Sequence, residues 1–284
     1  MGLGTVKSLY RYPVKSMLGE SLDAVHIGPG GIPGDRAWAV RDEDRGGIRG
    51  AKRFPDLMTF SARYDASPAA TGSSPATITL PDGEHLGTGD GNVGERLSEA
   101  LGSPVTLWPL MPADALDHYR RGAPMLDDME AEFRRMFGRE PDEPLPDLSV
   151  FPPELMEFES PLGTYFDAYP LLVMSQQSLD HMAAHHPESR YDVKRFRPNI
   201  LLDCDGDGLL EFAWEGKTMN VGGATLALTI KCPRCVMTTQ ATADLPKDPK
   251  VMRALVKDAG GDLGIYASVA TPGAVKIGDE GSLS

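Results

Sequence analysis

The sequence predicts a mainly β protein with peripheral helices, an α+β fold. The first hundred residues contain short apolar runs, rich in β-branched and aromatic residues and separated by Gly/Pro turns, as in a sandwich or barrel. Helical patterns are few and short. The chain has 284 residues and 41% hydrophobic content, enough to bury one large core or two modest ones.

In the first part, residues 1–110, we expect strands followed by one helix. Val93, Leu97, Ala100 and Leu101 share one helical face, and Gly102 stops the pattern. The expected strands cover residues 6–12, 22–27, 37–41, 57–64 and 76–80, and the helix covers 92–100.

Residues 111–161 differ, because this span is acidic and rich in proline. It contains one helical pattern, at 127–137. We interpret the span as a connector, which either forms a lid or is a mobile surface linker. It divides the chain into an N-terminal β-barrel domain (1–110), the connector (111–161) and a second β domain (162–284).

The last part again mixes strands and helices. Ser175 can cap a helix over residues 175–184. A second amphipathic helix is expected at 248–259, where Gly260 and Gly261 end it. The expected strands are 169–174, 200–202, 224–230, 265–269 and 275–277.

The formal net charge of −13 comes from 41 acidic and 28 basic residues. Such a surface repels nucleic acids and anionic membranes, so we expect neither as a partner. No stretch approaches the roughly 20 apolar residues of a membrane span. The first residues lack the pattern of a secretory signal, and three cysteines fit a reducing cytoplasm.

The segment from Lys231 to Thr239 holds two thiols, Cys232 and Cys235. Lys231 and Arg234 favour a thiolate, the form that attacks or binds a soft metal. A lone C-x-x-C is also compatible with a redox dithiol, half of a zinc site or two buried cysteines. The four Cys/His ligands of a typical structural zinc site are hard to find in this chain.

Three further motifs carry candidate anion-binding groups. Lys15 and Ser16 follow a strand end in Tyr12-Pro-Val-Lys-Ser16, Arg36 lies in Gly34-Asp-Arg-Ala-Trp38, and Arg195-Phe-Arg-Pro-Asn199 enters another strand. Such groups can hold a phosphate. Taken singly, each has an ordinary reading: a solvated lysine, a local Asp–Arg pair, or an arginine on an edge strand.

Taken in order with the Cys segment and a terminal Val275-Lys-Ile-Gly-Asp279, these motifs resemble the MOSC family. The resemblance covers nearly the whole chain and is weakest at 111–161. It is to the two-domain members, which have an N-terminal MOSC β-barrel domain before the MOSC β-barrel domain. The mitochondrial amidoxime-reducing component and its bacterial relatives belong to this group.

The resemblance implies a molybdenum pyranopterin cofactor between the two domains, with Cys235 as the catalytic thiolate and metal ligand. It implies cofactor contacts from both domains and from the Cys segment. The matching residues are Lys15, Ser16, Arg36, Arg197, Asn199, Arg234, Thr238 and Thr239. The implied activity is reduction of N-hydroxylated or other N–O small-molecule substrates, and the cofactor carries the redox step. Three cysteines cannot ligate an ordinary iron–sulfur cluster, so we expect a separate electron donor, a flavoprotein or ferredoxin-like protein.

The chain departs from the family pattern at two places. Residues 238–242 read Thr-Thr-Gln-Ala-Thr where relatives have Thr-Thr-Val-Asp-Pro, and residues 165–169 lack the small hydroxyl residues seen near the cofactor in relatives. Two other functions are therefore weighed: a sulfur carrier or sulfurtransferase with a Cys235 persulfide, and a non-catalytic binding module. The basic residues around a thiolate argue against the module.

Overall fold

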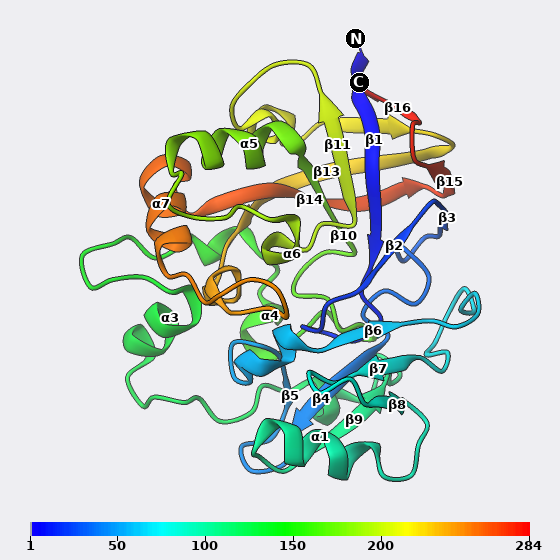
Figure 1. The fold of residues 1–284 in the computed structure, drawn as a ribbon, viewed down its shortest axis with the longest axis vertical. Helices are drawn as coiled ribbons and strands as arrows, with labels where there is room; N and C mark the ends of the chain where they lie inside the picture. Colours follow the sequence, from blue (N-terminus) through cyan, green and yellow to red (C-terminus); the bar gives the residue numbers. More distant parts are fainter. Residues whose placement is uncertain (1) are drawn as a thin grey trace.

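The computed structural model describes residues 2–284, and they form a mainly β structure with helices at the periphery, which confirms the predicted fold class. In Figure 1 the molecule has an upper part with long strands and a lower part with short ones. The connector, in green, runs along one side of both.

The upper part is a closed barrel of seven strands. Their order is β11-β10-β14-β13-β12-β16-β1, and pairing of β1 with β11 closes it. Apolar side chains from alternating strand positions, such as Val6, Val221 and Leu226, fill its interior. The strands are β1 (Gly2–Arg11), β10 (Leu171–Ser175), β11 (Ile200–Cys204), β12 (Thr218–Val221), β13 (Ala224–Pro233), β14 (Asp262–Thr271) and β16 (Glu280–Leu283).

Strand pairing crosses the expected domain boundary at residue 110. Strand β1, at the start of the chain, contributes to the barrel that the C-terminal part forms. Strand β2 (Glu20–Leu22) extends from β1, and β3 (Ala24–Ile27) pairs with β15 (Gly273–Lys276). The first and last parts of the chain are therefore joined by backbone hydrogen bonds as well as by the connector.

The lower part consists of two small antiparallel sheets around its own apolar core. The core includes Val14, Phe60 and Leu97, and Met237 of the C-terminal part packs into it. One sheet has the order β5-β4-β9: β5 (Ile48–Arg49), β4 (Trp38–Asp42) and β9 (Val105–Pro109). The other has the order β6-β7-β8: β6 (Ser61–Arg63), β7 (Thr77–Thr79) and β8 (His85–Gly87).

The four predicted helices are present, and their ends follow the expected signals. Helix α1 (Val93–Leu101) ends at Gly102 and α7 (Lys250–Ala259) at Gly260, both in the left-handed conformation. The Ser175 side chain caps α5 (Gln176–His185) by accepting a hydrogen bond from the backbone N–H of Ser178. The remaining helices are short: α2 (Leu116–Tyr119), α4 (Glu154–Glu157) and α6 (Val193–Phe196), with 3-10 helices η1 (Pro55–Thr59), η2 (Leu148–Val150), η3 (Leu210–Trp214) and η4 (Val236–Thr239).

Two strand predictions were wrong in detail. Residues 57–64 do not form one strand, because Pro55 starts the 3-10 helix η1, and only 61–63 pair as β6. Residues 22–27 divide into β2 and β3, which pair with different strands. Short strands such as β5, β8 and β16 were missed because two to four residues carry too little alternation to be recognised.

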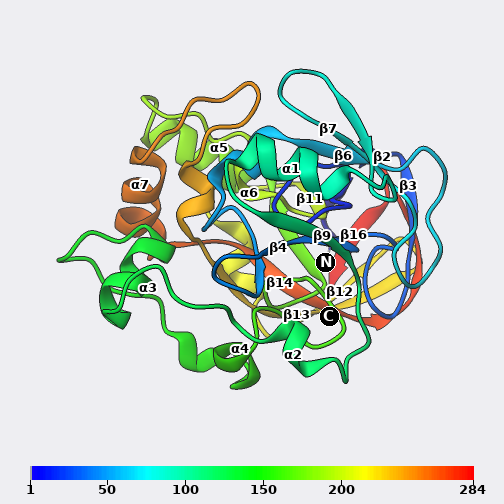
Figure 2. The ribbon, with the colours of Figure 1, turned by 90° about the horizontal axis from the view of Figure 1, so that it is seen from below.

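The connector is packed against both parts. Its helix α3 (Met129–Phe137) matches the prediction at 127–137 and is capped by Asp128. Figure 2 shows α3 and α4 on the same side of the molecule, with α3 near α7 of the C-terminal part. Tyr119 of α2 is 1% exposed and packs with Ala39 and Ile48 of the N-terminal part.

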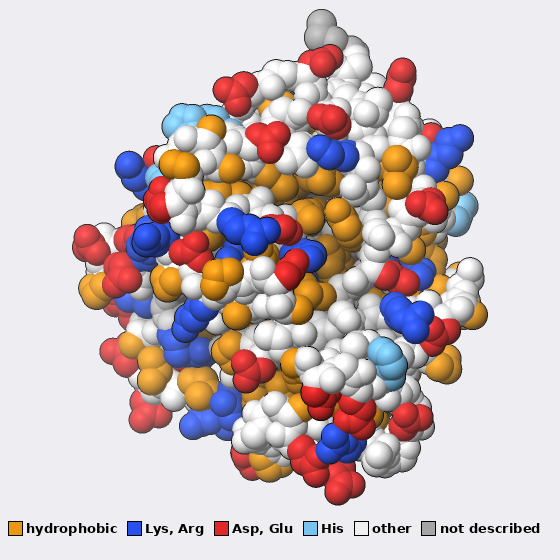
Figure 3. Space-filling model, viewed as in Figure 1, with side chains coloured by type: hydrophobic (Ala, Val, Ile, Leu, Met, Phe, Trp, Pro, Cys, Tyr) orange, Lys and Arg blue, Asp and Glu red, His pale blue; other side chains and the backbone are white. Residues whose placement is uncertain are grey.

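Acidic side chains occur across the face shown in Figure 3, intermixed with Lys and Arg, as the net charge of −13 leads one to expect. No helix within residues 2–284 combines the length and apolar character that a membrane crossing requires.

Candidate functional site

Three non-glycine residues among those described have a positive φ: Ser16 (69°), Arg36 (50°) and Arg197 (58°). All three are predicted cofactor-binding residues. A left-handed conformation at a non-glycine residue costs on the order of 1–3 kcal/mol, and such residues concentrate at functional sites. The backbone is therefore held in an unfavourable conformation at three of the positions that the motifs selected.

The carboxylate of Asp35 contacts one residue from each of the three anion-binding motifs: Tyr12, Arg36 and Asn199. Its Oδ1 accepts a hydrogen bond from the backbone N–H of Tyr12 at 2.7 Å. Its Oδ2 accepts from Nδ2 of Asn199 at 3.0 Å and pairs with the guanidinium of Arg36. Asp35 is 5% exposed, so this carboxylate is almost fully committed to fixing the positions of its neighbours.

The ring of Tyr12 lies near two guanidinium groups. The Cζ atom of Arg36 is 5.0 Å from the ring centroid, and that of Arg197 is 4.3 Å away. The only hydrogen bond of the Arg197 side chain among the described residues goes to the carbonyl oxygen of Met17. Burial, and then the neighbouring Arg36, lower the pKa of Arg197 to about 10. Asp35 pairs with the partly buried Arg36, whereas the buried Arg197 forms no salt bridge among the described residues, which leaves positive charge available for an anion.

Cys235 directly precedes the 3-10 helix η4, which fixes its position. The Thr238 hydroxyl donates to the Cys235 carbonyl oxygen at 3.1 Å, and the Thr239 hydroxyl donates to the Val236 carbonyl oxygen at 2.7 Å. Both threonines were predicted to contact the cofactor. In the structure their hydroxyl hydrogens hold the turn that presents the thiol, and Thr238 lines the cationic cavity.

Two buried arginines support the same loop. Nε and Nη1 of Arg234 donate to the carbonyl oxygens of Leu263 (2.8 Å) and Phe196 (3.0 Å). The Arg195 side chain donates to the backbone carbonyls of Arg190, Thr238, Gln240 and Pro246. Arg234 was predicted as a cofactor contact, and Arg195 as part of an anion clamp. Both donate to backbone carbonyls and position the loop, and both line the cationic cavity.

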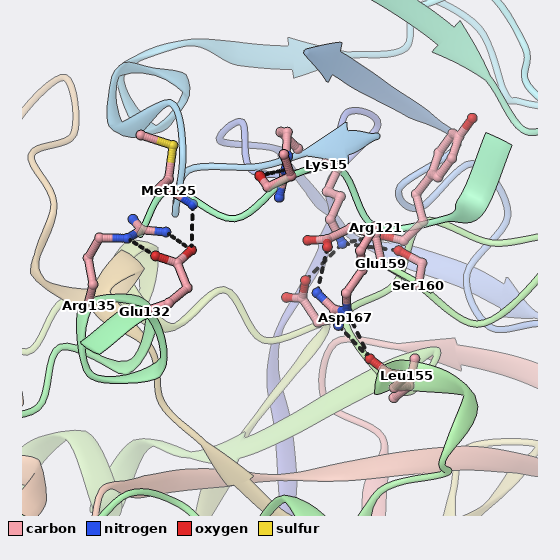
Figure 4. A network of polar contacts seen from close by, with 12 residues as sticks. Lys15, Arg121, Met125, Glu132, Arg135, Leu155, Glu159, Ser160 and Asp167 are labelled. Carbon is pink, nitrogen blue, oxygen red and sulfur yellow. Dashed lines mark hydrogen bonds and ion pairs between the residues drawn. The ribbon is translucent and has the colours of Figure 1, made fainter. Parts of the chain in front are cut away.

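The ammonium group of Lys15 is also hydrogen-bonded to protein groups. Its Nζ donates to Oδ1 of Asp167 at 2.8 Å, to the carbonyl oxygen of Tyr165 at 2.9 Å and to Oγ of Ser160 at 3.4 Å, as part of the network in Figure 4. Burial raises the pKa of Asp167, but Lys15, Lys52 and Arg36 outweigh it and hold that pKa well below its usual range. Lys15 therefore joins the N-terminal part to the connector and the C-terminal part.

Ser16 lies close to Gly50. The Ser16 Oγ accepts a hydrogen bond from the backbone N–H of Ala51 at 3.0 Å. A Cβ atom on Gly50 would lie 2.3 Å from that oxygen, so a larger residue there would displace Ser16. Asn199 is similarly occupied, since its Oδ1 accepts from the Leu172 N–H at 3.1 Å.

The three cysteines lie in different environments. Cys232 is 2% exposed and packs in an apolar cluster, and burial raises the pKa of its thiol. Burial raises the pKa of Cys204 to about 12. Cys235 is partly exposed and contacts open space on two sides. Cys235 is therefore the thiol best placed to meet a ligand.

Two cavities meet at Cys235. The smaller one, of about 60 Å³, is lined by Arg36, Arg197, Asn199 and Thr238 among others. The larger one, of about 210 Å³, is an open cleft lined mainly by the connector. We call them the cationic cavity and the connector cleft. Both include Asp167, Pro233, Cys235 and Tyr266 in their walls.

Comparison with known families decides the identity of the fold. Residues 3–89 match the MOSC N-terminal beta barrel domain, and residues 162–281 match the MOSC domain. The chain belongs to the MOSC family. The two matches occur in the order expected from the motifs and leave the connector between them unmatched.

Among characterised MOSC proteins, the chain is similar to mitochondrial amidoxime reducing component 2 of Bos taurus, with 24% identity over 98% of this chain and 82% of the relative. It is also 26% identical to mitochondrial amidoxime-reducing component 1 of Mus musculus, over 84% of this chain and 66% of that relative. The solved structure of the YuaD protein from Bacillus subtilis covers 99% of this chain and 94% of its own, with 14% identity and a TM-score of 0.44.

Three residues of the candidate site were not predicted from the sequence. Tyr12 and Asp35 stand inside recognised motifs but were not given roles. Lys52 lies in the wall of the connector cleft, and its only signal is the basic run Arg49-Gly-Ala-Lys-Arg53. Burial lowers the pKa of Lys52, but the nearby Cys235 and Asp167 outweigh it and raise that pKa.

Proposed function

We propose that this protein is a molybdenum-cofactor-dependent oxidoreductase that reduces N-hydroxylated or other N–O compounds. The observation that carries the proposal is the position of Cys235, where the cationic cavity meets the connector cleft. One cavity offers charge for an anionic cofactor, and the other gives a small molecule access to the same thiol.

The residues of the cationic cavity fit such a cofactor. Arg36 and the buried Arg197 both line this cavity, and only Arg36 is paired with a carboxylate, so an anionic phosphate would balance the charge of Arg197. Cys235 offers a sulfur ligand, which suits a soft or high-valent metal. Among residues 2–284, no cluster of three or more His, Cys, Asp or Glu side chains is placed to hold a metal ion.

When bound, the cofactor supplies the redox chemistry that removes oxygen from nitrogen. The protein side chains would bind the cofactor, orient it and balance its charge. Arg36 and Arg197 hold the anionic group, while η4 and Arg234 hold Cys235 in place. Asp167 stays ionised between Lys15 and Lys52, and Lys52 remains protonated beside the thiol. The site therefore places the sulfur of Cys235 among cations held in fixed positions.

Electrons for this reaction come, in our proposal, from a separate flavoprotein or ferredoxin-like protein in the cytoplasm. The chain has three cysteines, of which Cys204 and Cys232 are buried. Three cysteines cannot supply the four thiolate ligands of an ordinary iron–sulfur cluster.

The proposal is tested by cofactor analysis and turnover. Protein expressed in a molybdenum-replete host should carry close to one molybdenum and one pterin per chain, and zinc only in traces. It should reduce benzamidoxime when a chemical donor supplies electrons. Absence of molybdenum, together with a persulfide on Cys235 in the mass spectrum, would replace this function with sulfur transfer.

A further inference from the structure

The connector forms most of the wall of the cleft that leads to Cys235. Its helices α3 and α4 and the loops beside them contribute apolar side chains, among them Met125, Met129, Phe133, Met136, Phe151 and Met156. Methionine side chains are flexible and polarisable, so such a wall adapts to apolar ligands of differing shape.

Part of this apolar wall is open to solvent. Five of the six exposed large apolar side chains among residues 2–284 lie in the connector, and two of these, Met129 (52% exposed) and Met156 (57% exposed), line the cleft. Large apolar side chains that stay exposed around a concave site indicate a binding surface for an apolar group.

The charged groups of the cleft do not balance. Its three acidic residues are all paired: Glu132 with Arg135, Glu159 with Arg121, and Asp167 with Lys15, and Figure 4 shows these three pairs. Arg53 pairs with Asp42 outside the cleft. Two cations of the wall, Arg49 and Lys52, form no salt bridge within the described chain.

Lys52 and Arg49 are also short of hydrogen-bond partners. Lys52 Nζ makes no hydrogen bond within residues 2–284 and lies 5.7 Å from the centre of the Phe137 ring. Arg49 donates from Nη2 to the Ala123 carbonyl oxygen, but its buried Nε has no partner. Buried donors are normally satisfied, so the unsatisfied Nε of Arg49 indicates that a ligand provides an acceptor here, and the partly exposed Lys52 is free to contact the same ligand.

We infer that the connector cleft binds substrates that combine an apolar body with one anionic group, a carboxylate or phosphate, which Lys52 recognises beside Cys235. The apolar body contacts the methionine wall, and Arg49 adds a second donor to the anion. This inference rests on the proposed function and specifies its substrate class: anionic, apolar N–O compounds are preferred over neutral or cationic ones.

The test uses three probes that share one aromatic amidoxime scaffold: benzamidoxime, 4-carboxybenzamidoxime and 4-(aminomethyl)benzamidoxime. Binding to the cofactor-free full-length protein is measured by calorimetry, so it does not depend on turnover. We expect the carboxylated probe to bind about tenfold more tightly than the neutral one, the effect of a charge-assisted hydrogen bond. The cationic probe should bind most weakly.

Matched variants locate the effect. Lys52→Met should abolish the preference for the carboxylated probe, and Lys52→Arg should keep it. Lys217→Met, which removes an exposed lysine outside the cleft, should change nothing. Met129→Ser and Met156→Ser should weaken all three probes a few-fold, whereas Leu116→Ser, an exposed connector position outside the cleft wall, should not.

Equal binding of the neutral and carboxylated probes, or a preference that survives Lys52→Met, overturns the inference. If Lys52→Met does not fold, the salt dependence decides: only the carboxylated probe should lose affinity as ionic strength rises, and no such loss rejects the ion pair. The two proposals fail separately. A protein without molybdenum that still shows the Lys52-dependent preference refutes the redox function and retains the anionic ligand class.

Discussion

The side-chain amide of Asn199 donates a hydrogen bond to the carboxylate of Asp35 at 3.0 Å, although the two residues are 164 positions apart. Asp35 in turn pairs with Arg36 and accepts from the Tyr12 backbone. Because Asp35 is held by these partners, it neutralises Arg36 more directly than Arg197. Arg197, which forms no salt bridge among the described residues, is therefore less neutralised than Arg36.

Arg36→Lys and Arg197→Lys should lower cofactor retention without unfolding the protein. Lysine keeps the charge but lacks the planar fork that binds a phosphate through two hydrogen bonds. We expect molybdenum and pterin content to fall about tenfold, and the melting temperature of the cofactor-free protein to shift by less than about 2 °C. Arg63→Lys on the surface is the control. Unfolding of both cofactor-free variants would make these arginines structural ion-pair partners.

The left-handed backbone of Arg197 predicts an unusual order of stability. At φ 58°, glycine avoids the strain that alanine retains. Cofactor-free Arg197→Gly should therefore be more stable than Arg197→Ala by about 1 kcal/mol in urea unfolding. At Arg63, in strand β6, the order should reverse, because glycine weakens a strand. The same order at both positions would contradict the strain argument.

Glu211 predicts a pH dependence of stability remote from the site. Its carboxylate is buried, accepts hydrogen bonds from the Ser175 and Ser178 hydroxyls, and leaves Oε1 without a partner. Burial raises the pKa of Glu211 above its ordinary value of 4.5. The folded protein then holds this proton to higher pH than the unfolded chain does. The free energy of unfolding should fall as pH rises above about 4.5, by at most about 1.4 kcal/mol per pH unit.

Glu211→Gln removes the titrating group and should flatten this slope between pH 5 and 8. The exposed Glu215→Gln should leave it unchanged. Urea unfolding at several pH values measures both variants. A slope that persists in Glu211→Gln would assign the pH dependence to another group.

The sequence carried enough information for the regular elements and for the motif residues. Helices α1 and α7 were predicted because Gly102 and Gly260 end them in the left-handed conformation. Helix α5 was predicted because Ser175 caps its start. Pairing of β1 with β11 could not be read, since it depends on residues nearly 200 positions apart.

The roles of the site residues could be predicted only in part, because they too depend on contacts between distant segments. Motifs identified Arg36, Arg197 and Cys235, but not which side chains face the cavities. The side chains of Lys15 and Arg234 donate hydrogen bonds to protein oxygens from segments that are distant in the sequence. Lys52 was missed because its role depends on the absence of a partner, which a sequence does not display.

The two cysteines of the C-x-x-C segment should respond differently to replacement. Cys235 lines both cavities, whereas Cys232 reaches only the cationic cavity and packs in an apolar cluster at 2% exposure. Cys235→Ser removes the soft ligand and should abolish reduction of benzamidoxime with a chemical electron donor. Cys232→Ser should keep most of the activity, at a cost of about 1–2 kcal/mol in stability for a hydroxyl in an apolar site. A redox dithiol or zinc site needs both thiols, so equal loss in the two variants would contradict a single-thiolate metal site, and equal retention would exclude Cys235 as the ligand.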